Sequence, residues 1–64
     1  MIIDKKKLEV AMATACMNAH DLCKEAGMKY QLFYRVASGN NCKPATVGKI
    51  AKALNTPVEN LIAD

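Results

Sequence analysis

Polar, aromatic and basic side chains alternate with apolar ones in the middle of the 64-residue chain, at a spacing typical of a helix. Gln31 and Arg35 lie four positions apart, so they share one helical face, while Phe33 and Val36 share the opposite face. Glutamine can pair with N6 and N7 of adenine, and arginine with O6 and N7 of guanine. The pattern predicts a helix that packs on its apolar side and presents Gln31 and Arg35 to base edges. The alternative interpretation is a solvated helix face.

The positive charge of the chain is concentrated in its middle. The net charge is +3, and all 6 acidic residues lie in the flanks, because none occurs between Glu25 and Glu59. Basic residues continue through that window at Lys29, Arg35, Lys43, Lys49 and Lys52. This asymmetry favours a polyanionic partner, most simply nucleic acid. The alternative is a basic surface that is only solvated.

The other chemically versatile residues form no catalytic or metal-binding pattern. No nucleophile or carboxylate is arranged around His20, so we expect an exposed residue in a first helical turn. Cys16, His20 and Cys23 are conceivable zinc ligands, but the chain has no CxxC pair. Small buried thiols explain these cysteines and Cys42 more simply. We therefore expect no enzymatic activity, no metal, no cofactor and no small-molecule ligand.

Length and composition indicate one all-α domain over residues 1–64. Apolar residues make up 52% of the chain, prolines and glycines are few, and no segment has the alternating pattern of a strand. Charged residues follow directly after Met1-Ile2-Ile3, and no apolar run approaches membrane-spanning length. We therefore expect neither a signal peptide nor a membrane segment. Reduced thiols favour the cytoplasm.

Capping signals place the first two helices. Asp4 is a suitable N-cap for a helix that begins with three lysines at positions 5–7, which either keep the surface solvated or reach phosphates. Asn18 is predicted to cap the second helix, and Asp21 occupies its third position, where a carboxylate is favourable. Gly27 is predicted to end this helix in the left-handed conformation.

The remaining helices follow in close succession. The third is predicted from about residue 30 to 38 and ends at Gly39. The fourth follows Pro44, can end at Asn55, and has the clearest amphipathic spacing in the chain, at Val47, Ile50, Ala51 and Leu54. Residues 56–59 read Thr-Pro-Val-Glu, a capping box that predicts a short fifth helix.

Three segments, in order and at matching spacing, resemble the phage-repressor or Cro-like helix-turn-helix family, also called the XRE type. They are Leu22-Cys23 with Gly27, Phe33 with Val36 and Gly39, and the run TVGKIAKAL at 46–54. The resemblance covers about residues 7–62. It implies a compact five-helix, lambda-repressor-like DNA-binding domain, in which the second and third helices form the helix-turn-helix.

The resemblance also implies particular DNA contacts. The third helix would lie in the major groove and contact bases through Lys29, Tyr30, Gln31, Tyr34 and Arg35. The start of the second helix and the loop after the third would contact phosphates through Asn18, Ser38, Asn40, Asn41 and Lys43.

Several positions depart from the family pattern. Ala19 stands where many members have a glutamine that contacts phosphate, and Cys16 stands where glycine is usual between the first two helices. Lys29 and Lys43 occupy helix-cap positions, so capping there should be weak. Leu32 adds apolar bulk to the outer face, where it either contacts a thymine methyl group or belongs to an interface.

Met12 and Ala37 stand where the family often has an arginine and a glutamate in a partly buried ion pair. We expect the two side chains to pack near each other, because apolar contact can replace such a pair at no loss of stability.

These expectations converge on a sequence-specific regulator of transcription that binds double-stranded DNA, most simply a small repressor acting by occupancy. One module of this size buries little DNA, so we expect a homodimer on a two-fold operator with half-sites about 34 Å apart. We expect no separate sensor segment in a chain this short. The alternative is a protein-interaction module on the same fold, such as an antitoxin or an adaptor. A steep decline of binding with salt would distinguish DNA binding from this alternative.

Overall fold

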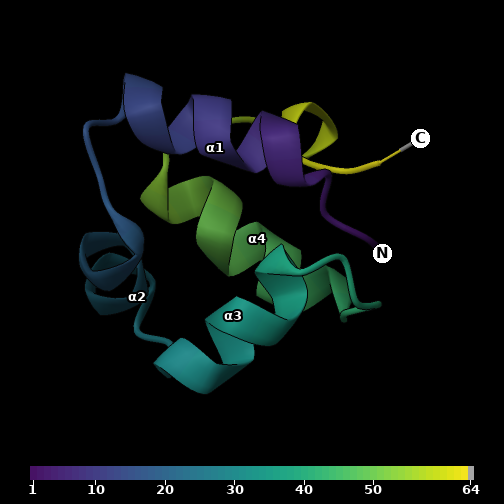
Figure 1. Cartoon of the computed structure of the whole chain (residues 1–64). Coiled ribbons are helices and arrows are strands. Elements are labelled where there is room, and N and C mark those ends of the chain that lie inside the picture. The colour runs from purple at the N-terminus through teal and green to yellow at the C-terminus, as the bar shows by residue number, and fades with distance from the viewer. Residues whose placement is uncertain (64) are drawn as a thin grey trace.

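Four α-helices and one 3₁₀ turn form the regular structure of residues 1–63, the part of the chain that the computed structural model describes. They are α1 (Lys5–Thr14), α2 (Ala19–Ala26), α3 (Tyr30–Ala37), α4 (Pro44–Ala53) and the 3₁₀ turn η1 (Val58–Asn60). Figure 1 shows α1 and α3 on opposite sides of α4, and α2 contacts both α3 and α4. Within residues 1–63, no helix combines the length and hydropathy needed to cross a membrane. The all-α class is confirmed.

The count of five helices is not confirmed, because the predicted short fifth helix is the three-residue 3₁₀ turn η1 and not an α-helix. Thr56 does not cap this turn: its hydroxyl donates instead to the carbonyl oxygen of Leu54, at 3.1 Å. Pro57 occupies the N-cap position and has no side-chain capping bond. Leu61 follows η1 and is fully buried. The capping pattern indicates where the helical turn begins. The turn ends after three residues, because the next residue, Leu61, is buried in the core.

Local capping chemistry fixes the ends of α1 and α2 as predicted. Asp4 Oδ1 accepts a hydrogen bond from the backbone N–H of Lys7 at 3.0 Å. Asn18 and Asp21 form a reciprocal capping box, with bonds of 2.8 and 3.3 Å. Gly27 ends α2 with a φ of 66°, in the left-handed region. These contacts satisfy backbone groups that a helix end leaves without partners, and they set the tight turn between α2 and α3.

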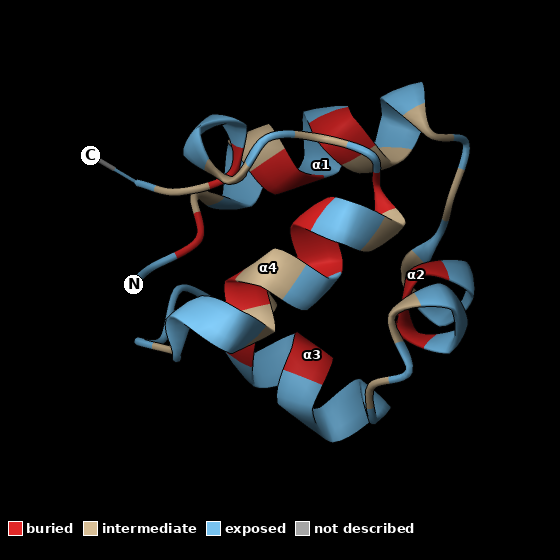
Figure 2. Cartoon of the chain, turned by 180° about the vertical axis from the view of Figure 1, so that it is seen from behind, coloured by how far each residue is buried: buried red, intermediate tan, exposed pale blue. Residues whose placement is uncertain are grey.

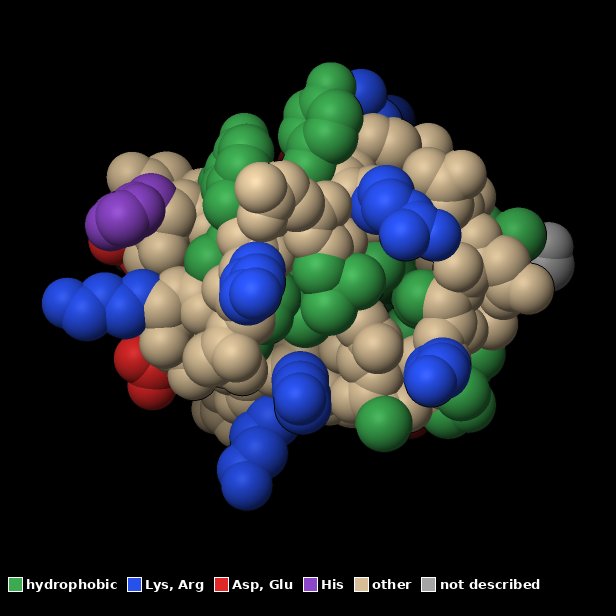
Figure 3. Space-filling model, turned by 90° about the horizontal axis from the view of Figure 1, so that it is seen from below, with side chains coloured by type: hydrophobic (Ala, Val, Ile, Leu, Met, Phe, Trp, Pro, Cys, Tyr) green, Lys and Arg blue, Asp and Glu red, His purple; other side chains and the backbone are tan. Residues whose placement is uncertain are grey.

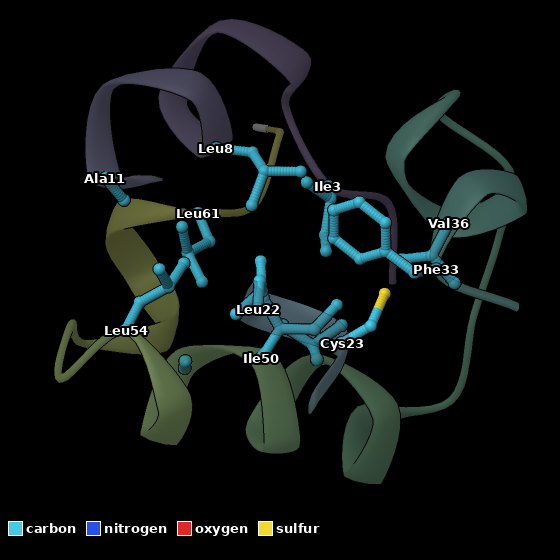
Figure 4. Packing of buried hydrophobic residues seen from close by; sticks show 12 residues of the cluster. Ile3, Leu8, Ala11, Leu22, Cys23, Phe33, Val36, Ile50, Leu54 and Leu61 are labelled. Carbon is cyan, nitrogen blue, oxygen red and sulfur yellow. The ribbon is translucent and has the colours of Figure 1, made fainter. Parts of the chain in front are cut away.

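One hydrophobic core joins the helices. Leu22 from α2 and Ile50 from α4 are fully buried, and Phe33 from α3 is 4% exposed. Figure 4 shows these three side chains pointing into the same interior, with Ile3 beside Phe33 and Leu8 above Leu22 and Ile50. The core therefore holds α3 from one side only and leaves its other side to solvent.

The N-terminal segment pairs with both the C-terminal segment and the loop between α3 and α4. Ile3 and Ile62 form an isolated antiparallel bridge, and Ile3 is 1% exposed. The backbone N–H of Cys42 donates to the carbonyl oxygen of Met1 at 2.8 Å. These contacts cover the core and tie down the loop that follows α3.

Candidate nucleic-acid interface

The outer face of α3 presents every residue that the sequence predicts to contact bases. The apolar face is held by Phe33 and Val36, which are 4% and 2% exposed. Lys29, Tyr30, Gln31, Tyr34 and Arg35 are all exposed, and so is Leu32. Figure 2 shows the same division, with buried positions of α3 facing the interior and exposed positions facing out. The structure thus brings the five predicted residues together on one surface.

Side chains on this face fall into three stripes, because successive residues of a helix are rotated by about 100°. Gln31 and Arg35 occupy the outermost stripe. Tyr30 and Tyr34 flank it on one side, and Leu32 flanks it on the other. The two tyrosine rings stack, with centroids 6.2 Å apart and an interplanar angle of 26°. Sequence reasoning missed this stacking, although the i, i+4 spacing of the two tyrosines signals it.

The short helix α3 depends on its surroundings to stay folded. It has 8 residues, and Lys29 at its N-cap makes no side-chain capping bond, as predicted. Isolated helices of this length are marginal in water. At the C-terminal end, Ser38 Oγ donates to the carbonyl oxygen of Tyr34 at 2.8 Å, and Asn40 Nδ2 donates to that of Arg35 at 2.9 Å. Core packing and these two bonds therefore position the exposed stripes.

The residues predicted to contact phosphates lie at the N-cap of α2 and between the C-cap of α3 and the N-cap of α4, and most of them also have a structural hydrogen bond. The predicted set is Asn18, Ser38, Asn40, Asn41 and Lys43, and all five are exposed. Asn18 caps α2 through its side-chain oxygen, and Asn41 Oδ1 accepts a bond from the amino group of Met1 at 2.7 Å. Lys43 is the N-cap of α4 and makes no side-chain capping bond. The sequence analysis placed these residues at helix ends and in the loop after α3. It missed the hydrogen bonds that the loop residues Asn40 and Asn41 make within the chain.

The surface around α3 is basic. No carboxylate occurs between Glu25 and Glu59, so α3, the loop after it and α4 carry lysine and arginine without acidic neighbours in the chain. Figure 3 views the molecule from the α3 side and shows lysine and arginine side chains around a central apolar area. Acidic side chains appear only near the margin of that view. This arrangement attracts a polyanion.

A groove of about 290 Å³ opens between α3 and the beginning of α4. Its lining includes Leu32, Arg35, Val36, Cys42, Lys43 and Thr46. The groove adjoins the outermost stripe of α3, because Arg35 belongs to both.

The three cysteines differ in their surroundings. Cys23 is buried, Cys42 is half-buried and Cys16 is exposed, so the expectation of small buried thiols is wrong for Cys16. Cys16 lies in the connection after α1 with a φ of 58°, in the left-handed region. Burial raises the pKa of the Cys23 thiol above its ordinary value, because desolvation disfavours the thiolate. Within residues 1–63, no group of three or more His, Cys, Asp or Glu side chains could hold a metal ion.

Comparison with known proteins agrees with this geometry. No curated protein matches the chain. A solved structure of a mutant hydroxyethylphosphonate dioxygenase is similar over 100% of this chain, with a TM-score of 0.84 and 28% sequence identity. The similar region covers 14% of the dioxygenase chain. A family model described as a Cro/C1-type helix-turn-helix DNA-binding domain matches residues 7–64. The chain belongs to the Cro/C1-type helix-turn-helix DNA-binding family.

Proposed function

We propose that this chain is a sequence-specific transcriptional regulator, a small repressor that reads the major groove of DNA with α3. The observation that carries the proposal is the outer stripe of α3. Gln31 and Arg35 are both exposed, share one helical face and are anchored from behind by Phe33 and Val36. These two side-chain types form bidentate contacts with adenine and guanine. A fixed helix with two such side chains can therefore distinguish base pairs.

Contacts with phosphates would position α3 in the groove. Lys43 stands at the N-terminus of α4, where the helix dipole and the first backbone N–H groups also favour an anion. Asn18 stands at the corresponding position of α2 and its oxygen is committed to the cap, which leaves its amide N–H groups to donate. Such contacts fix the register on the duplex without reading its sequence. Repression then follows from occupancy of the operator.

We propose further that the regulator binds its operator as a homodimer. The longest extent of one copy is 25 Å, whereas successive half-sites on one face of DNA are about 34 Å apart. One copy therefore covers one half-site. Exposed apolar side chains outside α3, at Met1, Ile2 and Val10, are available to a second copy. In this proposal the chain works in the cytoplasm and performs no catalytic step.

A second candidate is a protein-interaction module on the same fold. The similarity to 14% of a chain named as a dioxygenase favours it, because that chain is named for a catalytic activity and not for DNA binding. In such a role the exposed Tyr30 and Tyr34 would contact a protein, since tyrosine is enriched at protein interfaces.

Selection of bound duplexes from a random DNA pool tests the proposal. The regulator should enrich a two-fold symmetric sequence, and its affinity for that sequence should fall steeply as salt concentration rises. Recovery of unrelated sequences with weak salt dependence would contradict the regulator and favour the interaction module. Sedimentation with the enriched duplex should show two copies per site, and one copy per site would contradict the dimer.

A further inference from the structure

We propose that the groove beside α3 recognises the C5-methyl group of a thymine, with Leu32 as the residue that determines this preference. The inference rests on the proposed function, because it adds one specificity element to a helix that reads the major groove. The C5-methyl group is the apolar feature that a thymine presents there. The polar ends of Gln31 and Arg35 suit hydrogen-bonding base edges, whereas a methyl group is best contacted by an apolar side chain such as Leu32.

The lining of the groove supports an apolar occupant. Leu32 is 42% exposed, although it belongs to a helix whose other apolar residues, Phe33 and Val36, are buried. Val36 and the half-buried Cys42 contribute to the same groove. An isolated exposed leucine is ordinary, but this one lines a groove in which Val36 and Cys42 are its apolar neighbours.

Three of the side chains that line the groove make hydrogen bonds within the chain. Asn40 Nδ2 donates to the carbonyl oxygen of Arg35, and Asn41 Oδ1 accepts from the amino group of Met1. The Cys42 thiol donates to the carbonyl oxygen of Met1 at 3.2 Å. Because these atoms already have partners within the chain, this part of the groove favours a small apolar ligand group over a polar one.

The charges on the rim identify DNA as the molecule that carries this methyl group. Arg35 and Lys43 both line the groove, and no carboxylate occurs between Glu25 and Glu59. A second copy would bring the same two cations against its partner at a symmetric contact. A duplex instead supplies phosphates for the cations and a methyl group for the apolar surface. The stripe of Gln31 and Arg35 beside Leu32 would place that thymine next to the base pairs that these residues read.

Replacement of single thymines by deoxyuridine in the enriched duplex tests the inference, because uracil keeps O4 and the base pair and lacks only the C5-methyl group. The wild-type protein should lose about fourfold in affinity at one thymine per half-site, the amount expected for one buried methyl group. Leu32→Ala should lose about as much on the thymine duplex and become insensitive to deoxyuridine at that position. The matched control is Asn60→Ala, which truncates an exposed side chain in η1 and should keep the full sensitivity.

Three results would overturn the inference. One is a wild-type protein that prefers its duplex over a scrambled one but tolerates deoxyuridine at every thymine. Another is a Leu32→Ala protein that remains as sensitive as the wild type. A third is a Leu32→Ala protein whose only defect is a changed oligomeric state, which would assign Leu32 to a contact between copies. A wild-type protein without any preferred duplex would overturn the proposed function itself, so the two failures are distinguishable.

Discussion

Asn40 donates a hydrogen bond from Nδ2 to the backbone carbonyl oxygen of Arg35, at 2.9 Å. The loop after α3 thereby holds the last turn of the helix that presents Arg35. This bond links a residue predicted to contact phosphate to the position of a residue predicted to contact bases.

We expect Asn40→Ala to lower the free energy of unfolding by about 1 kcal/mol, because a carbonyl at the end of α3 loses its partner. Denaturation in urea measures this effect. Asn60→Ala serves as the control, since Asn60 is exposed and belongs to η1, which is separated from α3 in the sequence by α4. If Asn40→Ala weakened DNA binding with unchanged stability, Asn40 would be a phosphate contact alone.

Cys16 should be a site where glycine stabilises the protein. Its φ of 58° lies in the left-handed region, which is costly for a residue with a Cβ atom. Cys16→Gly should raise the free energy of unfolding by about 1 kcal/mol, after allowance for the greater entropy of glycine in the unfolded chain. Cys16→Ala removes the thiol but keeps the Cβ atom, so it should bring no such gain. Equal stability of the two variants under reducing conditions would contradict this explanation.

Cys23 should make the protein less stable at alkaline pH. Its pKa is raised from 9.0 in the folded state, so above that pH the unfolded chain loses the thiol proton more readily than the folded chain does. The stabilising contribution is complete below the unfolded pKa and is lost as pH rises through the folded pKa. Urea denaturation of the wild type between neutral and alkaline pH should show a decline that is shallower in Cys23→Ala, by at most about 1.4 kcal/mol per pH unit.

The exposed Cys16 provides the control for this pH dependence. Cys16→Ala should keep the alkaline decline of the wild type. Identical pH profiles for the wild type and Cys23→Ala would contradict a role for Cys23.

Ala37→Glu should destabilise the protein by about 1–3 kcal/mol, because it brings a carboxylate into a half-buried site that packs against the core. Met12 is also half-buried and packs against the core, and its contact with Ala37 remains a prediction. If the two positions face each other, adding Met12→Arg to Ala37→Glu should restore part of the loss. A double variant whose destabilisation equals the sum of the single ones would contradict their proximity.

Local chemistry explains why most of the fold could be predicted from the sequence. Asp4, Asn18 and Gly27 act on groups within a few residues of themselves, so their effects appear in the sequence pattern. The antiparallel bridge between Ile3 and Ile62 joins distant segments and leaves no local pattern. The same limit applies to η1, where local capping signals are overridden by the path of the chain into the core.

The candidate site likewise combines features that local sequence predicts with features that arise only from packing. The outward direction of Gln31 and Arg35 follows from helical periodicity and the apolar residues opposite them. The bond between Asn41 and Met1 depends on a contact across the fold, and the groove beside Leu32 requires α4 to lie next to α3. These features become visible only when the helices are packed together.

The most direct test of the account is the affinity of the wild type and of Arg35→Ala for the enriched duplex and for a scrambled duplex, measured at several salt concentrations. Lys43→Ala is the matched comparison. We expect Arg35→Ala to cost about 1–3 kcal/mol on the enriched duplex and to relax the preference at one base position. Lys43→Ala should weaken binding to both duplexes alike and reduce the salt slope by about one unit. An Arg35→Ala protein with unchanged specificity would show that Arg35 does not read bases. A wild-type protein that binds both duplexes equally would contradict sequence-specific regulation by α3.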